Sequence, residues 1–126
     1  MKRDMDLVRD ILIQVEESTH THGWCDINIE GRSAAEITYH VRMMHEQGLI
    51  EAQDLTTMSS VSWLPKRLTA QGHDFLDAAR SEKVWTLAKE AVVEATGTLT
   101  LDALEYAMPT IMRQLVARGE TEEDSD

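Results

Sequence analysis

The stretch "SAAEITYHVRMMHEQGLI", from Ser33 to Ile50, contains the signals that decide the fold. Ser33 and Glu36 stand three residues apart, which is the spacing of a capping box at the start of a helix. Apolar residues then recur on one face of that helix: Ile37, Val41 and Met44. Gly48 can adopt the left-handed conformation that ends a helix. The stretch therefore predicts a helix over residues 34–47 and a strand directly after it.

Two further elements are predicted before this helix. Residues 3–17 carry apolar side chains at spacings of three and four, which is typical of an amphipathic helix. These side chains are Met5, Val8, Leu12 and Val15, with Ile11 beside them. The pentapeptide "DINIE", residues 26–30, alternates Ile27 and Ile29 with polar residues, which is the period of a half-buried strand. We expect it to form a short edge strand.

Two extended stretches follow the central helix. "LIEAQDL" (49–55) and "SVSWLPKRL" (60–68) are separated by the polar "TTMSS" (56–60). This pattern predicts an antiparallel hairpin with a flexible tip. Pro65 has no amide hydrogen, so it limits the second strand to partial or edge pairing.

The C-terminal part of the chain is predicted to be helical. Thr69 and Ser81 are capping residues for two helices, and Gly97 closes the second. A last helix carries a narrow apolar seam: Leu101, Leu104, Met108, Ile111 and Leu115. Pro109 must kink this helix or restart it as a first-turn residue. The seam either docks on the first helix or forms a homodimer, and docking is favoured because Pro109 interrupts so short a seam.

The order of these elements is typical of a winged helix: a helix, a short strand, a second helix and a hairpin wing. A full helix-turn-helix needs two helices before the wing, whereas residues 31–47 have room for one of normal length. We therefore expect a mainly α (α+β) fold, with a winged-helix-like domain, a small antiparallel β-hairpin wing and a C-terminal helical extension. Its parts are a core over residues 1–69, C-terminal helices over 70–118 and an acidic disordered tail over 119–126.

Several segments in the first three quarters of the chain together carry a family resemblance. They are "MKRDMDLVRDIL", "INIEG" with "EITYHV", "GLIEAQDLTT", and "RLTAQGHDFLDAAR" followed by "VW". In this order they resemble a phage and prophage family known as domain of unknown function 2513. The resemblance implies a winged-helix-like fold in bacteria or their phages. That family has no established activity, so the resemblance assigns no catalytic residue.

The candidate nucleic-acid contacts lie on the central helix and the hairpin. Thr38, Arg42 and His45 fall at i, i+4 and i+7, where they would meet a groove of duplex DNA and Arg42 would read guanine edges. Phosphate contacts are expected from further polar side chains: Arg32, Thr56, Thr57, Ser59, Ser60, Lys66 and Arg67. The alternative is a solvated surface helix, on which Glu36 and Glu46 would repel DNA. The first hypothesis is a DNA-binding transcriptional regulator of phage or prophage genes.

The charge of the chain supports a second hypothesis. The net charge is −11, and the last eight residues, "GETEEDSD", hold five acids and no base, which leaves −6 for residues 1–118. Most of the affinity of proteins for nucleic acid comes from Lys and Arg that neutralise phosphates. The alternative function is therefore an acidic protein–protein interaction module that binds a host or phage protein. Such a module would mimic the negative charge of a nucleic acid.

No catalytic motif is evident in the sequence, and we expect a protein that is not an enzyme and needs no cofactor. His40 and His73, in the pairs "YH" and "GH", invite an acid–base hypothesis. The alternative is structural, because His40 adjoins the apolar face of the central helix and is expected to form hydrogen bonds at the border of the core. His73 is expected in the first turn of its own helix.

The stretch "HTHGWCDIN" brings together donor types that zinc accepts. The candidates are His20, His22, Cys25 and Asp26. A structural zinc site takes ligands from two separated segments, whereas these residues share one short loop, so we expect a connector without a metal. The single cysteine, the charged N-terminus and the lack of a long apolar run favour the cytoplasm, with neither an export signal nor a membrane span.

Overall fold

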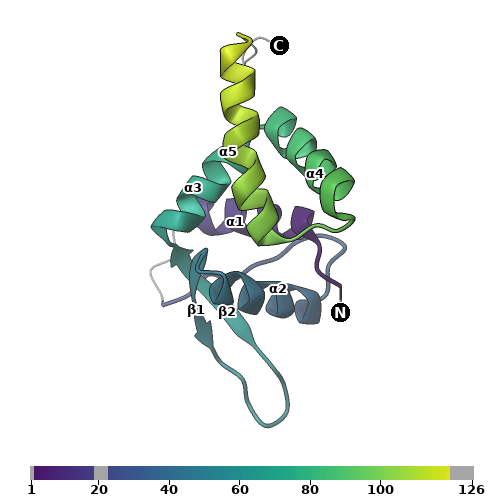
Figure 1. Ribbon diagram of the computed structural model, residues 1–126. Coiled ribbons are helices and arrows are strands. Elements are labelled where there is room, and N and C mark those ends of the chain that lie inside the picture. Colours follow the sequence, from purple (N-terminus) through teal and green to yellow (C-terminus); the bar gives the residue numbers. More distant parts are fainter. Residues whose placement is uncertain (1, 19–22, 120–126) are drawn as a thin grey trace. The chain divides into compact units, whose positions relative to one another are not determined.

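The computed structural model describes residues 2–18 and 23–119, which form a mainly helical α+β fold with one antiparallel hairpin (Figure 1). Its elements in chain order are α1 (Met5–Glu17), α2 (Ala34–Glu46), β1 (Ile50–Asp54), β2 (Trp63–Leu68), α3 (Ala70–Ala79), α4 (Glu82–Thr96) and α5 (Leu101–Ala117). The fold class expected from the sequence is confirmed. The chain divides into two compact units between Asp74 and Phe75, inside α3.

Both helices of the first unit begin at the caps that local sequence provides. The Asp4 carboxylate accepts hydrogen bonds from the backbone amides of Asp6 and Leu7 and so starts α1. Ser33 and Glu36 form the expected capping box, and Gly48 has a φ of 80° just beyond the end of α2. The predicted central helix is confirmed, because its start and its end are both decided by hydrogen bonds within a few residues.

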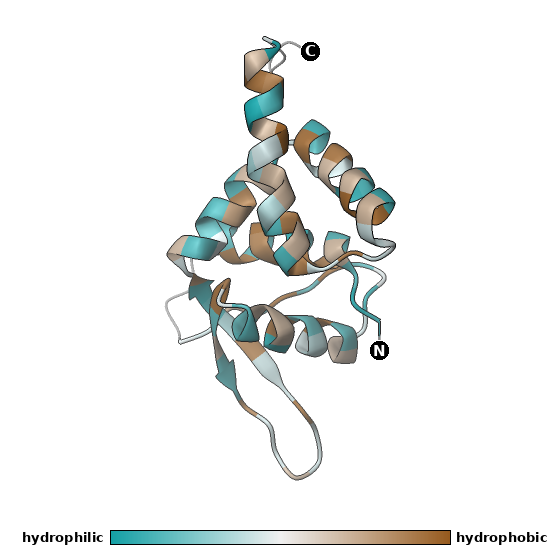
Figure 2. Cartoon of the chain, in the orientation of Figure 1, coloured by the Kyte–Doolittle hydropathy of each residue, from teal (hydrophilic) through white to brown (hydrophobic). Residues whose placement is uncertain are grey.

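The core of the first unit lies where α1 and α2 pack on each other and on the hairpin. Figure 2 shows the apolar residues of these helices recurring with the helical period. Buried side chains come from α1, α2 and the start and end of the hairpin: Met5, Leu7, Val8, Ile11, Leu12, Val15, Ile37, Val41, Met44, Leu49, Ile50 and Leu68. These include every apolar residue that the helical spacing selected, because that spacing places side chains on one face.

The hairpin pairs Ile50 with Leu68 and Asp54 with Trp63, which confirms the predicted antiparallel arrangement. The register shifts between Glu51 and Ala52, and Ala52 pairs with Pro65. A bulge tolerates a proline because a residue there need not donate a ladder hydrogen bond. On the side of β2 that faces away from β1, the Pro65 carbonyl accepts a hydrogen bond of 2.6 Å from the Cys25 amide.

The prediction of an edge strand at residues 26–30 is wrong, since these residues form no strand in the structure. The reason is a side chain. Gln14 of α1 donates to the Asn28 carbonyl at 2.8 Å and accepts from the Asn28 amide at 3.2 Å. A glutamine amide thus satisfies both backbone groups of Asn28 that a neighbouring strand would otherwise pair.

The second unit contains the last part of α3 together with α4 and α5, which pack against each other. Ser81 caps α4 through the Val84 amide, and Gly97, with a φ of 81°, ends that helix as predicted. The Phe75 and Trp85 rings meet edge to face at 6.2 Å. The helix α5 runs through Pro109 without a break, so of the two predicted effects of Pro109 the restart does not occur.

The first turn of α3 approaches the backbone of Leu49 closely. Thr69 caps α3 by accepting from the Gly72 amide, and its own hydroxyl donates to the Gly48 carbonyl at 2.5 Å. The Thr69 amide donates to the Leu49 carbonyl at 3.0 Å. A Cβ atom at Gly72 would collide with that same carbonyl group, which is backbone and cannot turn aside. Glycine is therefore required here by space.

We predict that Gly72→Ala lowers the free energy of unfolding by about 1–3 kcal/mol, the usual cost of overpacking. The loss is opposed by the greater helix propensity of alanine, which is worth about 1 kcal/mol. Urea denaturation of the full chain measures it. Gly23→Ala is the matched control, because nothing lies within 4 Å of a Cβ there. Equal stability of the two variants would contradict the argument from space.

Candidate nucleic-acid interface

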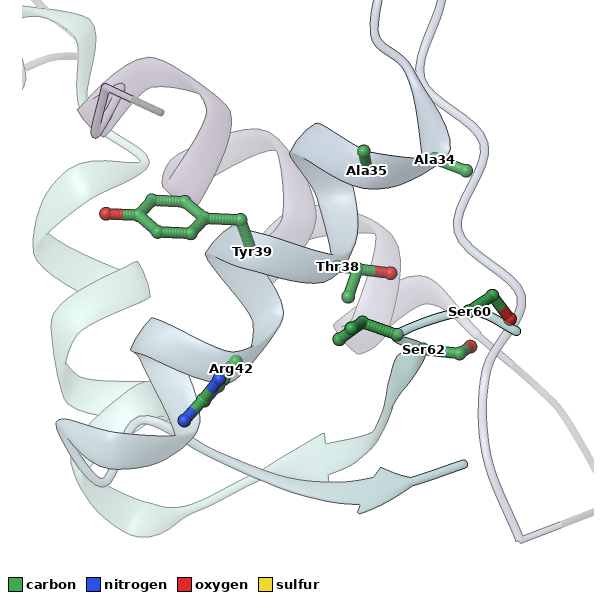
Figure 3. Close-up of a pocket in the computed structure, with 8 residues that line it drawn as sticks. Ala34, Ala35, Thr38, Tyr39, Arg42, Ser60 and Ser62 are labelled. Atoms are coloured by element: carbon green, nitrogen blue, oxygen red, sulfur yellow. The ribbon is translucent and has the colours of Figure 1, made fainter. Parts of the chain in front are cut away.

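A groove of about 540 Å³ lies between the exposed side of α2 and the outer part of the hairpin. Its helix wall consists of Ala34, Ala35, Thr38, Tyr39 and Arg42, and its hairpin wall of Ser60, Val61 and Ser62. Figure 3 shows Thr38 on α2 opposite Ser60 and Ser62, with Arg42 one turn further along the helix. The groove therefore combines small side chains, hydroxyls and one cation.

The hairpin wall of this groove is held by regular hydrogen bonds beyond the assigned strands. The Leu55 amide donates to the Ser62 carbonyl at 2.8 Å, and the Thr57 amide donates to the Ser60 carbonyl at 2.9 Å. The chain then reverses through Met58 and Ser59. The hairpin pairing thus extends beyond the strands to Thr57 and Ser60, and its backbone positions Ser60 and Ser62.

The helix wall begins at the first turn of α2, with the short side chains of Ala34 and Ala35. The capping box occupies the amides of Ser33 and Glu36, and this end of the helix carries the positive end of its dipole. Arg42 lies two turns further on, with a side chain that is 57% exposed. It is 3.6 Å from Glu46, and an ion pair so exposed is weak enough to be exchanged for another anion.

Three predicted contacts come together at this groove, and the others do not. Thr38, Arg42 and Ser60 line it. His45 lies beside the strands instead, where its Nδ1 is 3.3 Å from the Ile50 carbonyl oxygen and its ring is 5.4 Å from that of Trp63. The i+7 spacing keeps His45 on nearly the same side of α2 as Thr38, but two turns further along, where Ile50 and Trp63 of the hairpin contact it.

The expected phosphate contacts of the hairpin have other partners in the structure. Arg67 forms an ion pair with Glu51 across the strands and also donates to the Leu68 carbonyl. The hydroxyl of Thr57 lies 3.2 Å from that of Ser59, within the tip. Lys66 is half-buried on β2, outside the groove lining. Thr56 accepts from the Ser62 amide and so supports the hairpin wall.

Arg32 is engaged in a network that joins the starts of α1 and α2. Its guanidinium forms ion pairs with Asp4 at 2.5 Å and with Glu36 at 3.2 Å. Burial raises the pKa of Asp4, but the hydrogen bonds from Arg32 and from the Leu7 and Asp6 amides outweigh it, and the pKa is lowered overall. The Ser33 amide and Arg32 lower the pKa of Glu36, and Asp4 raises that of Arg32. Arg32 is thus a structural cation.

His40 lies next to this network and is 1% exposed. Its Nε2 accepts from the Asp4 amide at 2.8 Å, and its Nδ1 donates to the Glu36 carbonyl at 2.8 Å. Both ring nitrogens are satisfied in one neutral tautomer, so the structural alternative for His40 is confirmed. His73 is exposed in the first part of α3.

The metal candidates are only partly covered by the structure. His20 and His22 lie outside the described residues. Cys25 is buried with its Sγ 3.6 Å from the Lys66 carbonyl oxygen, whereas Asp26 is exposed. Among the described residues, no group of three or more His, Cys, Asp or Glu could hold a metal ion. Of the acidic tail expected over residues 119–126, the structure describes only Gly119.

Sequence reasoning missed five residues that line the groove. These are Ala34, Ala35, Tyr39, Val61 and Ser62. The alanines directly after the capping serine were the available signal, because small residues in the first turn of a capped helix leave its amides accessible. No local pattern identifies Val61 and Ser62, since the hairpin register decides which tip residues face α2.

The chain belongs to the family described as "Hypothetical protein (DUF2513)", whose model matches residues 2–98. It is also similar to an "Uncharacterized protein" of Haemophilus influenzae (strain ATCC 51907 / DSM 11121 / KW20 / Rd). The two are 33% identical over 118 residues, which cover 93% of this chain and 100% of the relative. No solved structure matches the chain. No helix in the described ranges is long and apolar enough to cross a membrane.

The lowered pKa of Asp4 predicts a loss of stability in acid. A group whose pKa is lowered by folding stabilises the folded state above its unfolded pKa, and this contribution disappears as the pH falls through the folded pKa. Asp4→Asn keeps a capping oxygen but removes the charge that pairs with Arg32. We expect the variant to be less stable than the wild type at pH 7, with the difference shrinking below about pH 4.

Urea denaturation at a series of pH values measures both effects. Asp10→Asn, at an exposed position of α1, serves as the control for the loss of one negative charge. A difference between Asp4→Asn and the wild type that stays constant from pH 7 to acid would show that the charge of Asp4 contributes nothing.

Proposed function

We propose that this protein is a winged-helix DNA-binding module that acts as a transcriptional regulator of phage or prophage type. The observation that carries the proposal is the groove between α2 and the hairpin, with Thr38 and Arg42 facing Ser60 and Ser62. In winged helices the helix before the wing enters the major groove of DNA. The element order of α1, α2, β1 and β2 places α2 in that position.

In this arrangement one strand of the DNA backbone occupies the groove. Its phosphates accept hydrogen bonds from the hydroxyls of Thr38, Ser60 and Ser62 and from the amides of Ala34 and Ala35, which the capping box does not use. Ala34 and Ala35 permit close approach because their side chains are short. Arg42 exchanges Glu46 for a phosphate or a guanine edge. The helix then lies in the major groove and the hairpin follows the backbone on the other side.

The charges predict the manner of binding. Arg32 and Arg67 are held by acidic partners, so Arg42 is the principal cation of the groove lining. The number of phosphates neutralised sets the slope of affinity against salt. We therefore expect a shallow salt dependence and a large share of hydrogen bonds from neutral hydroxyls.

Fluorescence anisotropy with labelled duplex fragments over a series of salt concentrations tests the proposal. Arg42→Ala should weaken binding about tenfold and reduce the salt slope by about 1. Thr38→Val, which removes one hydroxyl at constant shape, should weaken binding by a smaller factor. Arg80→Ala removes the same charge outside the groove and is the matched control.

The proposal fails if neither the full chain nor a version without residues 119–126 binds duplex DNA at low salt. The shortened version is needed because the five acids of residues 119–126 would repel DNA. It also fails if Arg42→Ala and Arg80→Ala weaken binding equally, because the groove would then have no special role.

The exposed tip of the hairpin supports a second candidate, an acidic module that binds a host or phage protein. Met58 is fully exposed at the tip and Val61 is 62% exposed. No charged residue lies between Asp54 and Lys66. Uncharged, apolar tips of this kind are better suited to the core of a protein interface than to contact with a phosphate backbone.

The two candidates respond differently to variants of the tip and of the helix. For a protein partner, affinity purification from lysogenic cells should recover a stoichiometric protein with the wild type and lose it with Met58→Asp. Arg42→Ala should leave that recovery intact. Loss of DNA binding with Arg42→Ala and no effect of Met58→Asp on any captured protein would decide against this candidate.

A further inference from the structure

The helix α5 has a second apolar face that the chain leaves open. Tyr106 is 83% exposed, Val116 71% and Met112 40%. Together with the exposed Pro109 they recur at spacings of three and four, so they share one side of the helix. Figure 2 shows hydrophobic residues continuing to the C-terminal end of α5. Isolated exposed apolar residues are ordinary, but a row on one helix marks an interaction surface.

This open face differs from the apolar seam that was predicted for α5. Four residues of that seam are buried within the single chain: Leu101, Leu104, Met108 and Leu115. Residues of the same chain therefore cover this seam, and α5 packs on α4; the predicted docking on the first helix stays a prediction. A partner of α5 therefore meets the row formed by Tyr106, Pro109, Met112 and Val116, which we call the outer row.

Two opposite charges flank the outer row. Asp102 and Arg113 are eleven residues apart, which is close to three full turns, so they lie on the same side of α5, about 16 Å apart along its axis. Both residues are exposed. Arg113 also lies 3.4 Å from the Thr110 hydroxyl, one turn back on the same helix. This side of α5 is thus negative before Tyr106 and positive beside Met112.

We propose that the outer row binds a second copy of this chain, with the two α5 helices antiparallel. In that arrangement Asp102 of each copy faces Arg113 of the other, and the pair occurs twice because a two-fold interface is self-complementary. A parallel arrangement would place Asp102 on Asp102 and Arg113 on Arg113, and like charges repel. The antiparallel arrangement also opposes the two helix dipoles.

Charge complementarity is what selects a second copy as the occupant. Pairing Asp102 with Arg113 puts the two-fold axis between residues 107 and 108. In this register the Tyr106 ring of each copy faces Pro109 of the other, so the apolar row meets itself across the axis. The proposal depends on residues of the second unit alone, so it does not rest on DNA binding.

Sedimentation equilibrium of the full chain over a range of concentrations tests the proposal. The wild type should show a reversible monomer–dimer equilibrium. Tyr106→Glu should leave it monomeric over the same range. Val93→Glu is the matched control, because Val93 is 46% exposed on α4, outside the outer row, and gains the same charge. It should dimerise like the wild type.

A charge exchange tests the orientation of the two helices. Arg113→Asp and Asp102→Arg should each weaken dimerisation roughly tenfold, because two attractive pairs become repulsive. The double variant should recover most of the loss. Circular dichroism of each variant separates these effects from unfolding of α5.

Three outcomes would overturn the proposal. The first is a chain that stays monomeric up to about 1 mM. The second is a dimer that Tyr106→Glu does not weaken more than Val93→Glu does. The third is a double charge variant that, while folded, dimerises no better than the two single variants, since this result excludes the antiparallel pairing.

Discussion

The close approach of Gly72 to the carbonyl of Leu49 is the constraint on which the first unit depends. Gly48 lies just beyond the end of α2, Leu49 directly precedes β1, and Thr69 directly follows β2, so three elements meet at this point. The Thr69 amide and hydroxyl bond to Leu49 and Gly48, so both ends of the hairpin are tied to the end of α2. The direction in which the hairpin leaves α2 follows from this junction, and so does the width of the groove.

The opposite end of α2 is held by a second set of contacts. Arg32 bridges Asp4 and Glu36, and His40 links the start of α1 to the first turn of α2. The helix is therefore positioned at both ends by groups that do not face the groove. Preformed walls reduce the conformational entropy lost on binding, which suits a site that relies on a few hydroxyls and one arginine.

The arginines of this protein differ in the partners that hold them. The chain is strongly acidic, yet Arg32 and Arg67 form ion pairs within the fold. Arg42 pairs with the exposed Glu46 of its own helix and also attracts the carboxylate of Asp54. On α5 the acid and the base are separated along the helix. Arg42 is thus the cation of the groove lining within a strongly acidic chain.

The sequence by itself determined the helices, their caps and the hairpin. Ser33, Thr69, Ser81 and Gly97 act as predicted, because capping depends on hydrogen bonds between residues no more than four apart. The helical spacing of apolar residues likewise selected the buried face of α1 and α2. On the candidate site, Thr38 and Arg42 were identified because they lie opposite that buried face.

Tertiary structure alone decided the points that depend on distant residues. Gln14 satisfies the backbone of Asn28 and so prevents an edge strand that alternation predicted. Asp4, 28 residues away in the chain, converts Arg32 from a predicted phosphate contact into a structural ion pair. The hairpin register brings Ser60 and Ser62 to the groove. Periodicity describes one element at a time, whereas these outcomes depend on which elements meet.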